Sequence, residues 1–120
     1  MVLASQVLTG LVAALHLYFL VLEMFLWATP RGQKVFGRTA AEQESTKVLA
    51  ANQGLYNGFL AAGLVWSLIG GAAVSLPVRT FFLGCVVVAG VYGGLTATRK
   101  ILFVQAVPAA VALAVTLAIR

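Results

Sequence analysis

The chain has 120 residues, of which 62% are hydrophobic and 9% are charged, and its mean hydropathy is +1.02. These values exclude an ordinary soluble protein, because so little polar surface could not solvate the exterior of a folded domain. The net charge of +5 does not indicate nucleic-acid binding, because the basic residues stand at the ends of apolar runs, where they set membrane topology.

Four apolar runs are each long enough to cross a bilayer as a helix. They cover residues 3–28, 48–71, 77–98 and 101–119. Helices are required because a lipid-exposed segment must satisfy its own backbone hydrogen bonds, and the alternating polarity of a β-barrel strand is absent. The sequence therefore predicts an all-α membrane protein with one domain, residues 1–120, built as an antiparallel bundle of four transmembrane helices.

The connection between the first two predicted helices, residues 29–47, is the only long one. The stretch Thr29-Pro-Arg-Gly32 is predicted to end the first helix, because proline cannot continue it and glycine frees the turn. Thr39 and Glu42 form a capping-box pattern, which predicts either a short surface helix around residues 40–44 or a solvated linker.

Basic residues are distributed unevenly between the two predicted sides of the membrane. The first and third connections hold six of them, against two on the other side: Arg31, Lys34, Arg38, Lys47, Arg99 and Lys100, against Arg79 and Arg120. Because positively charged connections stay in the cytoplasm, this bias predicts a multi-pass protein of the cell (inner) membrane with both termini outside the cytoplasm.

Small residues recur at helical spacing in the second and third apolar runs. Gly54, Gly58 and Ala62 form one stripe, and Gly90 and Gly94 form another. Such stripes let helix backbones approach closely in lipid, either within one chain or between subunits. With the small surface that four short helices bury, they favour a homo-oligomer.

Polar residues from all four predicted helices share one depth, within roughly 15 Å of the cytoplasmic helix ends at about 1.5 Å per residue. A carboxyl group in an apolar run usually persists because it pairs, titrates or binds something. These polar residues could therefore form an interhelical hydrogen-bond network, or they could line a ligand cavity that opens to the cytoplasmic leaflet. The predicted ligand-binding residues are Glu23, Asn52, Gln53, Tyr56, Asn57, Tyr92, Arg99 and Gln105.

No catalytic residue is assigned, because no recognised catalytic motif is present. One histidine, His16, and three acidic residues cannot build a conventional metal cluster, so no metal site is predicted. His16 is interpreted as a hydrogen-bonded core residue and the single cysteine, Cys85, as a small packing residue. Whether the protein is an enzyme stays open at this point.

Four runs resemble a small bacterial membrane-protein family catalogued as domain of unknown function 1304. They are residues 16–24, 29–37, 51–60 and 84–93, which read HLYFLVLEM, TPRGQKVFG, ANQGLYNGFL and GCVVVAGVYG. Together these runs extend the resemblance over nearly the whole chain. The family implies a membrane location and carries no established activity.

A more distant resemblance is to the MAPEG superfamily, the membrane-associated proteins of eicosanoid and glutathione metabolism. It lies in Lys34-Val-Phe, in Asn52 to Asn57 and in Ala89-Gly-Val-Tyr92, although Tyr56 and Gly90 stand where that superfamily has Glu and Arg. The resemblance implies four-helix homotrimers with glutathione between subunits near the cytoplasmic side. Of the residue types used for glutathione, Asn52, Tyr92 and Arg99 match by position.

Three functions follow from these observations. In the first, the protein binds a small amphipathic or thiol-type ligand as a MAPEG-like enzyme or binding protein, with Tyr92 facing an anionic or thiolate centre and Arg99 holding a carboxylate. In the second, it is a small proton-coupled transporter of the multidrug type, in which Glu23 exchanges a proton for a cationic substrate. In the third, it is a membrane assembly partner without chemistry.

Overall fold

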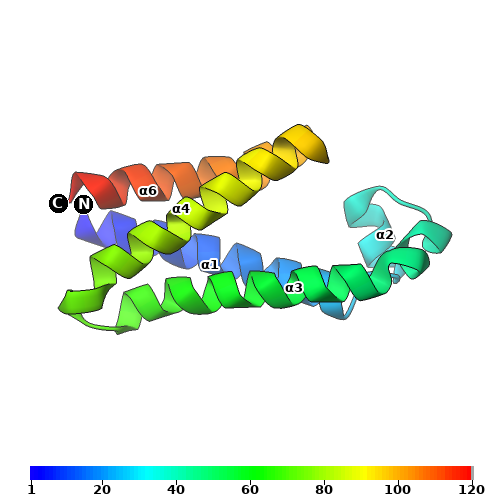
Figure 1. Cartoon of the computed structure of the whole chain (residues 1–120), viewed down its shortest axis with the longest axis horizontal. Helices are drawn as coiled ribbons and strands as arrows, with labels where there is room; N and C mark the ends of the chain where they lie inside the picture. The colour runs from blue at the N-terminus through cyan, green and yellow to red at the C-terminus, as the bar shows by residue number, and fades with distance from the viewer. Residues whose placement is uncertain (120) are drawn as a thin grey trace. The chain divides into compact units, whose positions relative to one another are not determined.

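The computed structural model describes residues 1–119, and every regular element in that range is helical (Figure 1). The α-helices are α1 (Val2–Met24), α2 (Pro30–Phe36), α3 (Ala40–Ile69), α4 (Ala72–Thr96), α5 (Arg99–Ile101) and α6 (Val107–Ala118), and a π-helix, η1 (Leu102–Ala106), joins α5 to α6. The predicted all-α class is therefore confirmed.

The chain divides into two compact units. The terminal unit comprises Met1–Ala14 and Leu60–Arg120, and the central unit comprises Leu15–Phe59. The two long helices α1 and α3 contribute one part to each unit. The terminal unit therefore contains the start of α1, the end of α3 and everything after it, whereas the central unit contains the end of α1, α2 and the start of α3.

Four helical segments pack around one apolar core in the terminal unit. The core side chains come from α1, α3, α4 and α6: Val12, Ala13, Leu64, Leu83, Val86, Ala109 and Ala112. At one end of this core the Ser5 and Thr116 hydroxyl oxygens are 2.7 Å apart. The first turns of α1 and the last turns of α6 therefore lie together, which fits two chain ends on the same side of a membrane.

Helix α4 packs against both η1 and α6, and Figure 1 shows α4 and α6 side by side. A Cβ atom added at Gly90 would lie 2.6 Å from the backbone nitrogen of Ala106 and 2.8 Å from its Cα atom. This backbone contact leaves no space for a side chain at residue 90. The Gly90–Gly94 stripe is thus used for packing within the chain.

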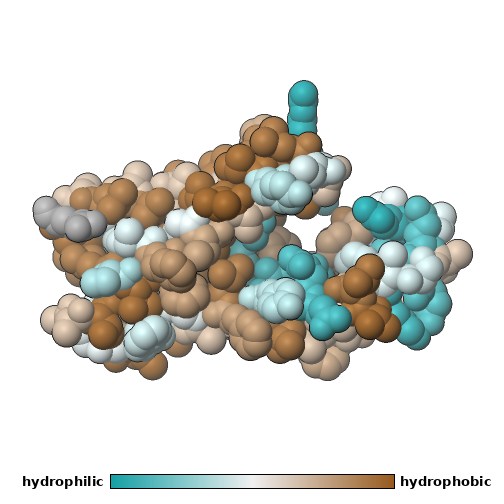
Figure 2. Space-filling model, viewed as in Figure 1, coloured by the Kyte–Doolittle hydropathy of each residue, from teal (hydrophilic) through white to brown (hydrophobic). Residues whose placement is uncertain are grey.

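Three helical segments of the described chain are long and apolar enough to cross a membrane: Val2–Met24, Ala72–Thr96 and Arg99–Ala118. Length and composition thus indicate a multi-pass membrane protein, and Figure 2 shows hydrophobic side chains over much of α4 and α6. The second predicted span, now part of α3, is not among them, because Asn52, Gln53 and Asn57 lower its hydropathy. Its crossing of the membrane stays a prediction.

Several predicted helix boundaries were wrong. α1 ends at Met24 instead of residue 28, and α2 follows because Thr29 caps it, Pro30 starts it and Gly37 (φ 65°) ends it. α3 begins at Ala40 instead of residue 48, because the capping box of Thr39 and Glu42 starts the long helix itself.

The last two predicted helices also begin earlier than expected. α4 starts at Ala72, so Pro77 lies inside the helix instead of starting it. The fourth helical run starts at Arg99 and widens into η1 before Pro108, where the N–H of Val107 bonds the Leu102 carbonyl five residues back. Proline removes a helical N–H and crowds the preceding turn, which explains the local widening.

Arg79 was counted among the charges on the outer side of the membrane, which stays a prediction, and the structure buries its side chain inside the terminal unit. It is only 2% exposed and donates hydrogen bonds to Ser5, Ser67 and Ser75. Polar oxygens from three helices satisfy the guanidinium there, which is the arrangement that makes a buried cation tolerable.

Candidate functional site

The central unit contains a buried contact between the carboxyl group of Glu23 and the amide of Asn57. Asn57 Nδ2 donates to Glu23 Oε1 at 2.5 Å, and the Asn57 side chain is only 6% exposed. Glu23 stands in the last turn of α1 and Asn57 near the middle of α3. The structure thus brings Glu23 into contact with one residue of the Asn52–Asn57 segment, while a shared polar ligand site stays a prediction.

Gly54 lets the end of α1 come close to α3 inside the central unit. A Cβ atom at residue 54 would lie 3.1 Å from the Cβ atom of Glu23 and 2.6 Å from the Cγ atom of Met24. Residues three apart share a helix face, so Gly54 and Asn57 both face the end of α1. Because Gly54 has no side chain, the two helices come close enough for Asn57 to bond the Glu23 carboxylate. This stripe also serves contacts within the chain.

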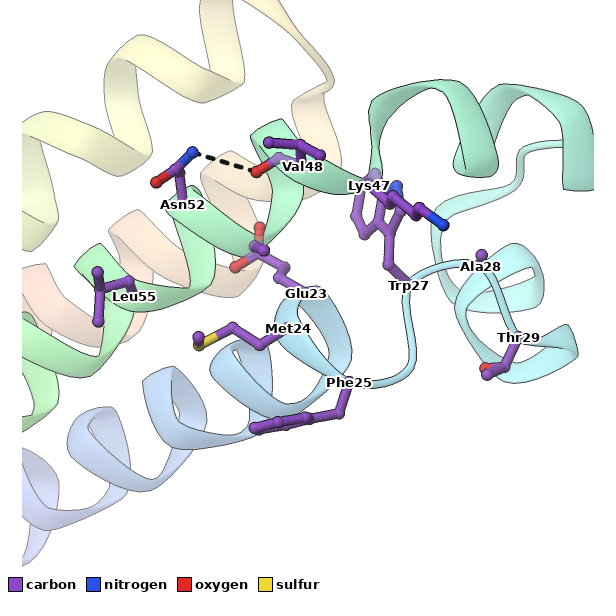
Figure 3. A pocket seen from close by; sticks show the side chains of 11 residues that line it. Glu23, Met24, Phe25, Trp27, Ala28, Thr29, Lys47, Val48, Asn52 and Leu55 are labelled. Atoms are coloured by element: carbon purple, nitrogen blue, oxygen red, sulfur yellow. Dashed lines mark hydrogen bonds between the residues drawn. The ribbon is translucent and has the colours of Figure 1, made fainter.

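An open cleft of about 640 Å³ lies beside Glu23 (Figure 3). Its lining comes from the end of α1, the turn that follows and residues 47–55 of α3: Glu23, Met24, Phe25, Trp27, Ala28, Thr29, Lys47, Val48, Ala51, Asn52 and Leu55. Most of these side chains are apolar. A cleft with an apolar lining and a few polar groups is the usual form of a small-molecule site.

Hydrogen bonds within the chain engage one donor of each of three polar lining residues. Asn52 Nδ2 donates to the Val48 carbonyl at 3.2 Å, as the dashed line in Figure 3 shows. Thr29 Oγ1 donates to the Leu26 carbonyl at 2.6 Å, and Lys47 Nζ lies 2.5 Å from Glu44 Oε1. Thr29 Oγ1 also accepts from the Gly32 N–H at 3.4 Å, whereas the Glu23 carboxylate offers the lining acceptor positions alone.

The turn after α1 is held in place by the start of α3 and by α2. Trp27 Nε1 donates to Thr46 Oγ1 at 3.0 Å, and the buried Gln43 donates from Nε2 to the Trp27 carbonyl at 2.8 Å. The ring of Trp27 also packs on that of Phe36, with centroids 4.6 Å apart. These contacts fix the wall of the cleft that Trp27 provides.

Only some of the predicted site residues lie at the cleft. Glu23 and Asn52 line the cleft, and Asn57 holds Glu23 from behind. Gln53 and Tyr56 are exposed and do not line it, and the Tyr56 ring packs near Phe59 at 6.1 Å. Tyr92, Arg99 and Gln105 belong to the terminal unit, so their place in a ligand site stays a prediction.

Sequence reasoning missed the part of the cleft that lies beyond α1. Thr29 was interpreted as part of a helix end, although Thr29 followed by Pro30 is a typical helix start and indicated a folded turn here. His16 is fully buried, as expected, and meets Phe19 edge to face at 5.7 Å. Among the described residues no group of three His, Cys, Asp or Glu side chains could hold a metal ion.

Together, the fold and the site define a small all-α protein with helices suited to a membrane and a half-buried carboxylate beside a cleft. The chain belongs to the protein family of unknown function DUF1304, whose model matches residues 10–117. It is 33% identical over 107 residues to the uncharacterized protein YpaA of Lactococcus lactis subsp. lactis (strain IL1403), covering 88% of this chain and 89% of that protein. No solved structure matches the chain.

Proposed function

We propose that this protein is an integral membrane protein that binds a small amphipathic molecule in the cleft beside Glu23. One observation carries the proposal: the Glu23 carboxylate, fixed by Asn57, lines a cleft whose other walls are mostly apolar. A carboxylate in an apolar helix is costly, and such residues in membrane proteins usually mark functional sites. An amphipathic ligand would satisfy both parts of this lining.

The apolar part of the ligand would lie against Met24, Val48 and Leu55, and its polar part would face Glu23 and Asn52. Asn57 adds orientation, because its amide holds one oxygen of the carboxylate from the side of α3. A preformed polar group costs less to engage than a mobile one. The arrangement thus supports binding without requiring a reaction.

The MAPEG resemblance adds finer features to the proposal. They are four membrane crossings that include α3, a cytoplasmic position for residues 29–47, a trimer, and the participation of Tyr92 and Arg99. The glycine stripes no longer favour an oligomer, since Gly54 and Gly90 make their close contacts within the chain. The trimer therefore rests on the resemblance alone.

A cleft-filling variant tests the proposal. The protein is extracted from its native membrane in mild detergent, and small molecules that remain bound are identified by native mass spectrometry. Ala51→Phe fills the cleft, whereas Leu49→Phe adds the same ring at a position that is 72% exposed and outside the lining. We expect a retained amphipathic molecule in the parent and in Leu49→Phe, and none in Ala51→Phe. Equal retention in both variants would overturn the proposal.

A further inference from the structure

We infer that the cleft takes a cationic amphiphile, with a primary or secondary ammonium group against Glu23 and an apolar tail along the neighbouring side chains. This inference rests on the proposed function and names the ligand class. It follows from the polar atoms that the lining offers, which are mainly hydrogen-bond acceptors with one negative charge. An ammonium group supplies both the donors and the charge that such a lining lacks.

The two acceptors are oxygen atoms on facing helices. Glu23 Oε1 accepts from Asn57, and Glu23 Oε2 accepts no hydrogen bond from the described residues. Asn52 donates its amide N–H to the Val48 carbonyl, which leaves its Oδ1 atom as an acceptor. A carboxylate has about four acceptor positions, so one bond from Asn57 leaves most of its capacity for a ligand.

Lys47 is the only cationic side chain of the lining. Its Nζ atom lies 2.5 Å from Glu44 Oε1, and Glu44 does not line the cleft. The positive charge is therefore compensated on the outer side of α3. Among the described residues the Glu23 carboxyl forms no ion pair, and the group that donates to it is the neutral amide of Asn57.

An anionic ligand is disfavoured by the same geometry. A carboxylate or thiolate near Glu23 would place two like charges close together in a partly apolar surrounding, where their repulsion is stronger than in water. The rings of Phe25 and Trp27 also belong to the lining, and aromatic faces attract cations. The cleft therefore selects against the thiol peptide that the MAPEG resemblance implies.

The test compares three probes that share one alkyl chain and differ only in the head group: n-decylamine, n-decanol and n-decanoate. The whole chain is used in mild detergent with Trp66→Phe, so that Trp27 in the cleft is the remaining tryptophan and its fluorescence reports binding. Near neutral pH we expect saturable binding of the amine, weaker binding of the alcohol and none of the carboxylate.

Two matched variants complete the test. Glu23→Gln removes the charge but keeps an acceptor for Asn57, and it should weaken amine binding by at least about tenfold. Glu42→Gln makes the same charge change outside the cleft and should leave amine affinity unchanged. Circular dichroism of both variants checks that the helices persist.

The outcomes separate the two proposals. If n-decanol or n-decanoate binds as well as the amine, or if Glu23→Gln leaves amine affinity unchanged, the cationic class is overturned while an amphiphile cleft stands. If none of the three probes binds saturably, the cleft proposal itself fails. Binding of n-decanoate that is lost in Lys47→Met would assign the opposite charge to the ligand.

Discussion

The guanidinium of Arg79 in α4 donates a hydrogen bond to the hydroxyl of Ser5 in α1 at 2.9 Å, across 74 positions of sequence. Its Nη2 atom donates to the Ser67 carbonyl at 3.0 Å and to the Ser75 hydroxyl at 3.1 Å, and its Nε atom donates to the Ser67 hydroxyl at 3.4 Å. The acidic side chains of the chain, Glu23, Glu42 and Glu44, all belong to the central unit. Among the described residues, the oxygens that accept from this buried cation are therefore all neutral.

Replacing Arg79 with lysine should destabilise the terminal unit. Lysine keeps the positive charge but presents its three donors at one point, so it cannot reach oxygens on three helices as the planar guanidinium does. We expect a loss of about 1–3 kcal/mol in the free energy of unfolding, measured by thermal denaturation in mild detergent. Arg38→Lys, at an exposed position after α2, is the matched control and should change little. Equal midpoints for the two variants would contradict the bridging role of Arg79.

That Glu23 lies at the depth of the Asn52–Asn57 segment could be predicted from the sequence, because depth along adjacent helices is a matter of counting residues. Glu23 lies six residues before the polar turn at Thr29, and the Asn52–Asn57 segment begins five residues after Lys47 at the charged start of the second run. Rotation about the helix axis could not be counted in this way. Tyr56 precedes Asn57 by one residue, about 100° around the helix, and is 57% exposed.

The position of Arg79 could not be predicted because it depends on side chains from distant helices. An arginine two residues after a proline at the end of an apolar run is typical of an interfacial charge. Its burial requires hydroxyls on α1 and α3, which only the packed helices bring together. The position of the Trp27 side chain in the cleft wall could not be predicted for the same reason, since it depends on contacts with α2 and with Thr46.

The contact between Gly90 and Ala106 predicts a sharp penalty for a small substitution. In Gly90→Ala the new methyl group would meet the Ala106 backbone, which cannot move aside without shifting η1. We expect a loss of about 1–3 kcal/mol in the free energy of unfolding. Gly84→Ala is the control on the same helix, because nothing lies within 4 Å of its added Cβ atom. A similar loss of stability in both variants would mean that the close contact with Ala106 is not the reason why glycine is needed at residue 90.

The capping box at the start of α3 predicts a pH dependence. Glu42 Oε1 accepts from the Thr39 N–H at 2.9 Å and from its hydroxyl at 3.0 Å, and these bonds lower the pKa of the Glu42 carboxyl. Because the folded pKa lies below the unfolded one, the cap stabilises the helix above the unfolded pKa and is lost as pH falls through the folded pKa.

Acidification below about pH 4, near the usual pKa of glutamate, should therefore fray the first turn of α3. The amide resonances of Thr39 and Glu42 would report the change by NMR. Glu42→Gln keeps an acceptor oxygen but cannot titrate, so its first turn should show no such transition. A transition of equal size in that variant would assign the pH dependence to another group.

The charge bias predicts that the two ends of α3 lie on opposite sides of the membrane. In a Cys85→Ala background, Arg38→Cys and Ala72→Cys place single thiols at exposed positions before and after α3. A membrane-impermeant maleimide should label Ala72→Cys in intact cells, and Arg38→Cys only after permeabilisation. Labelling of both thiols in intact cells would exclude a membrane crossing by α3, and the reverse pattern would invert the topology.

Finally, the contact between Glu23 and Asn57 predicts an energetic coupling that a double-mutant cycle can measure. Asn57→Ala leaves the Glu23 carboxyl without its amide donor, and Glu23→Ala leaves the amide without its acceptor, so each single variant should be destabilised. In the double variant neither partner is left unpaired. Its loss should therefore be smaller than the sum of the single losses, by about 0.5–2 kcal/mol for a hydrogen bond between membrane helices. The same cycle with Asn52→Ala is the control, because the Asn52 amide donates to the Val48 carbonyl. Additive losses for Glu23 and Asn57 would show that the contact does not couple the end of α1 to α3.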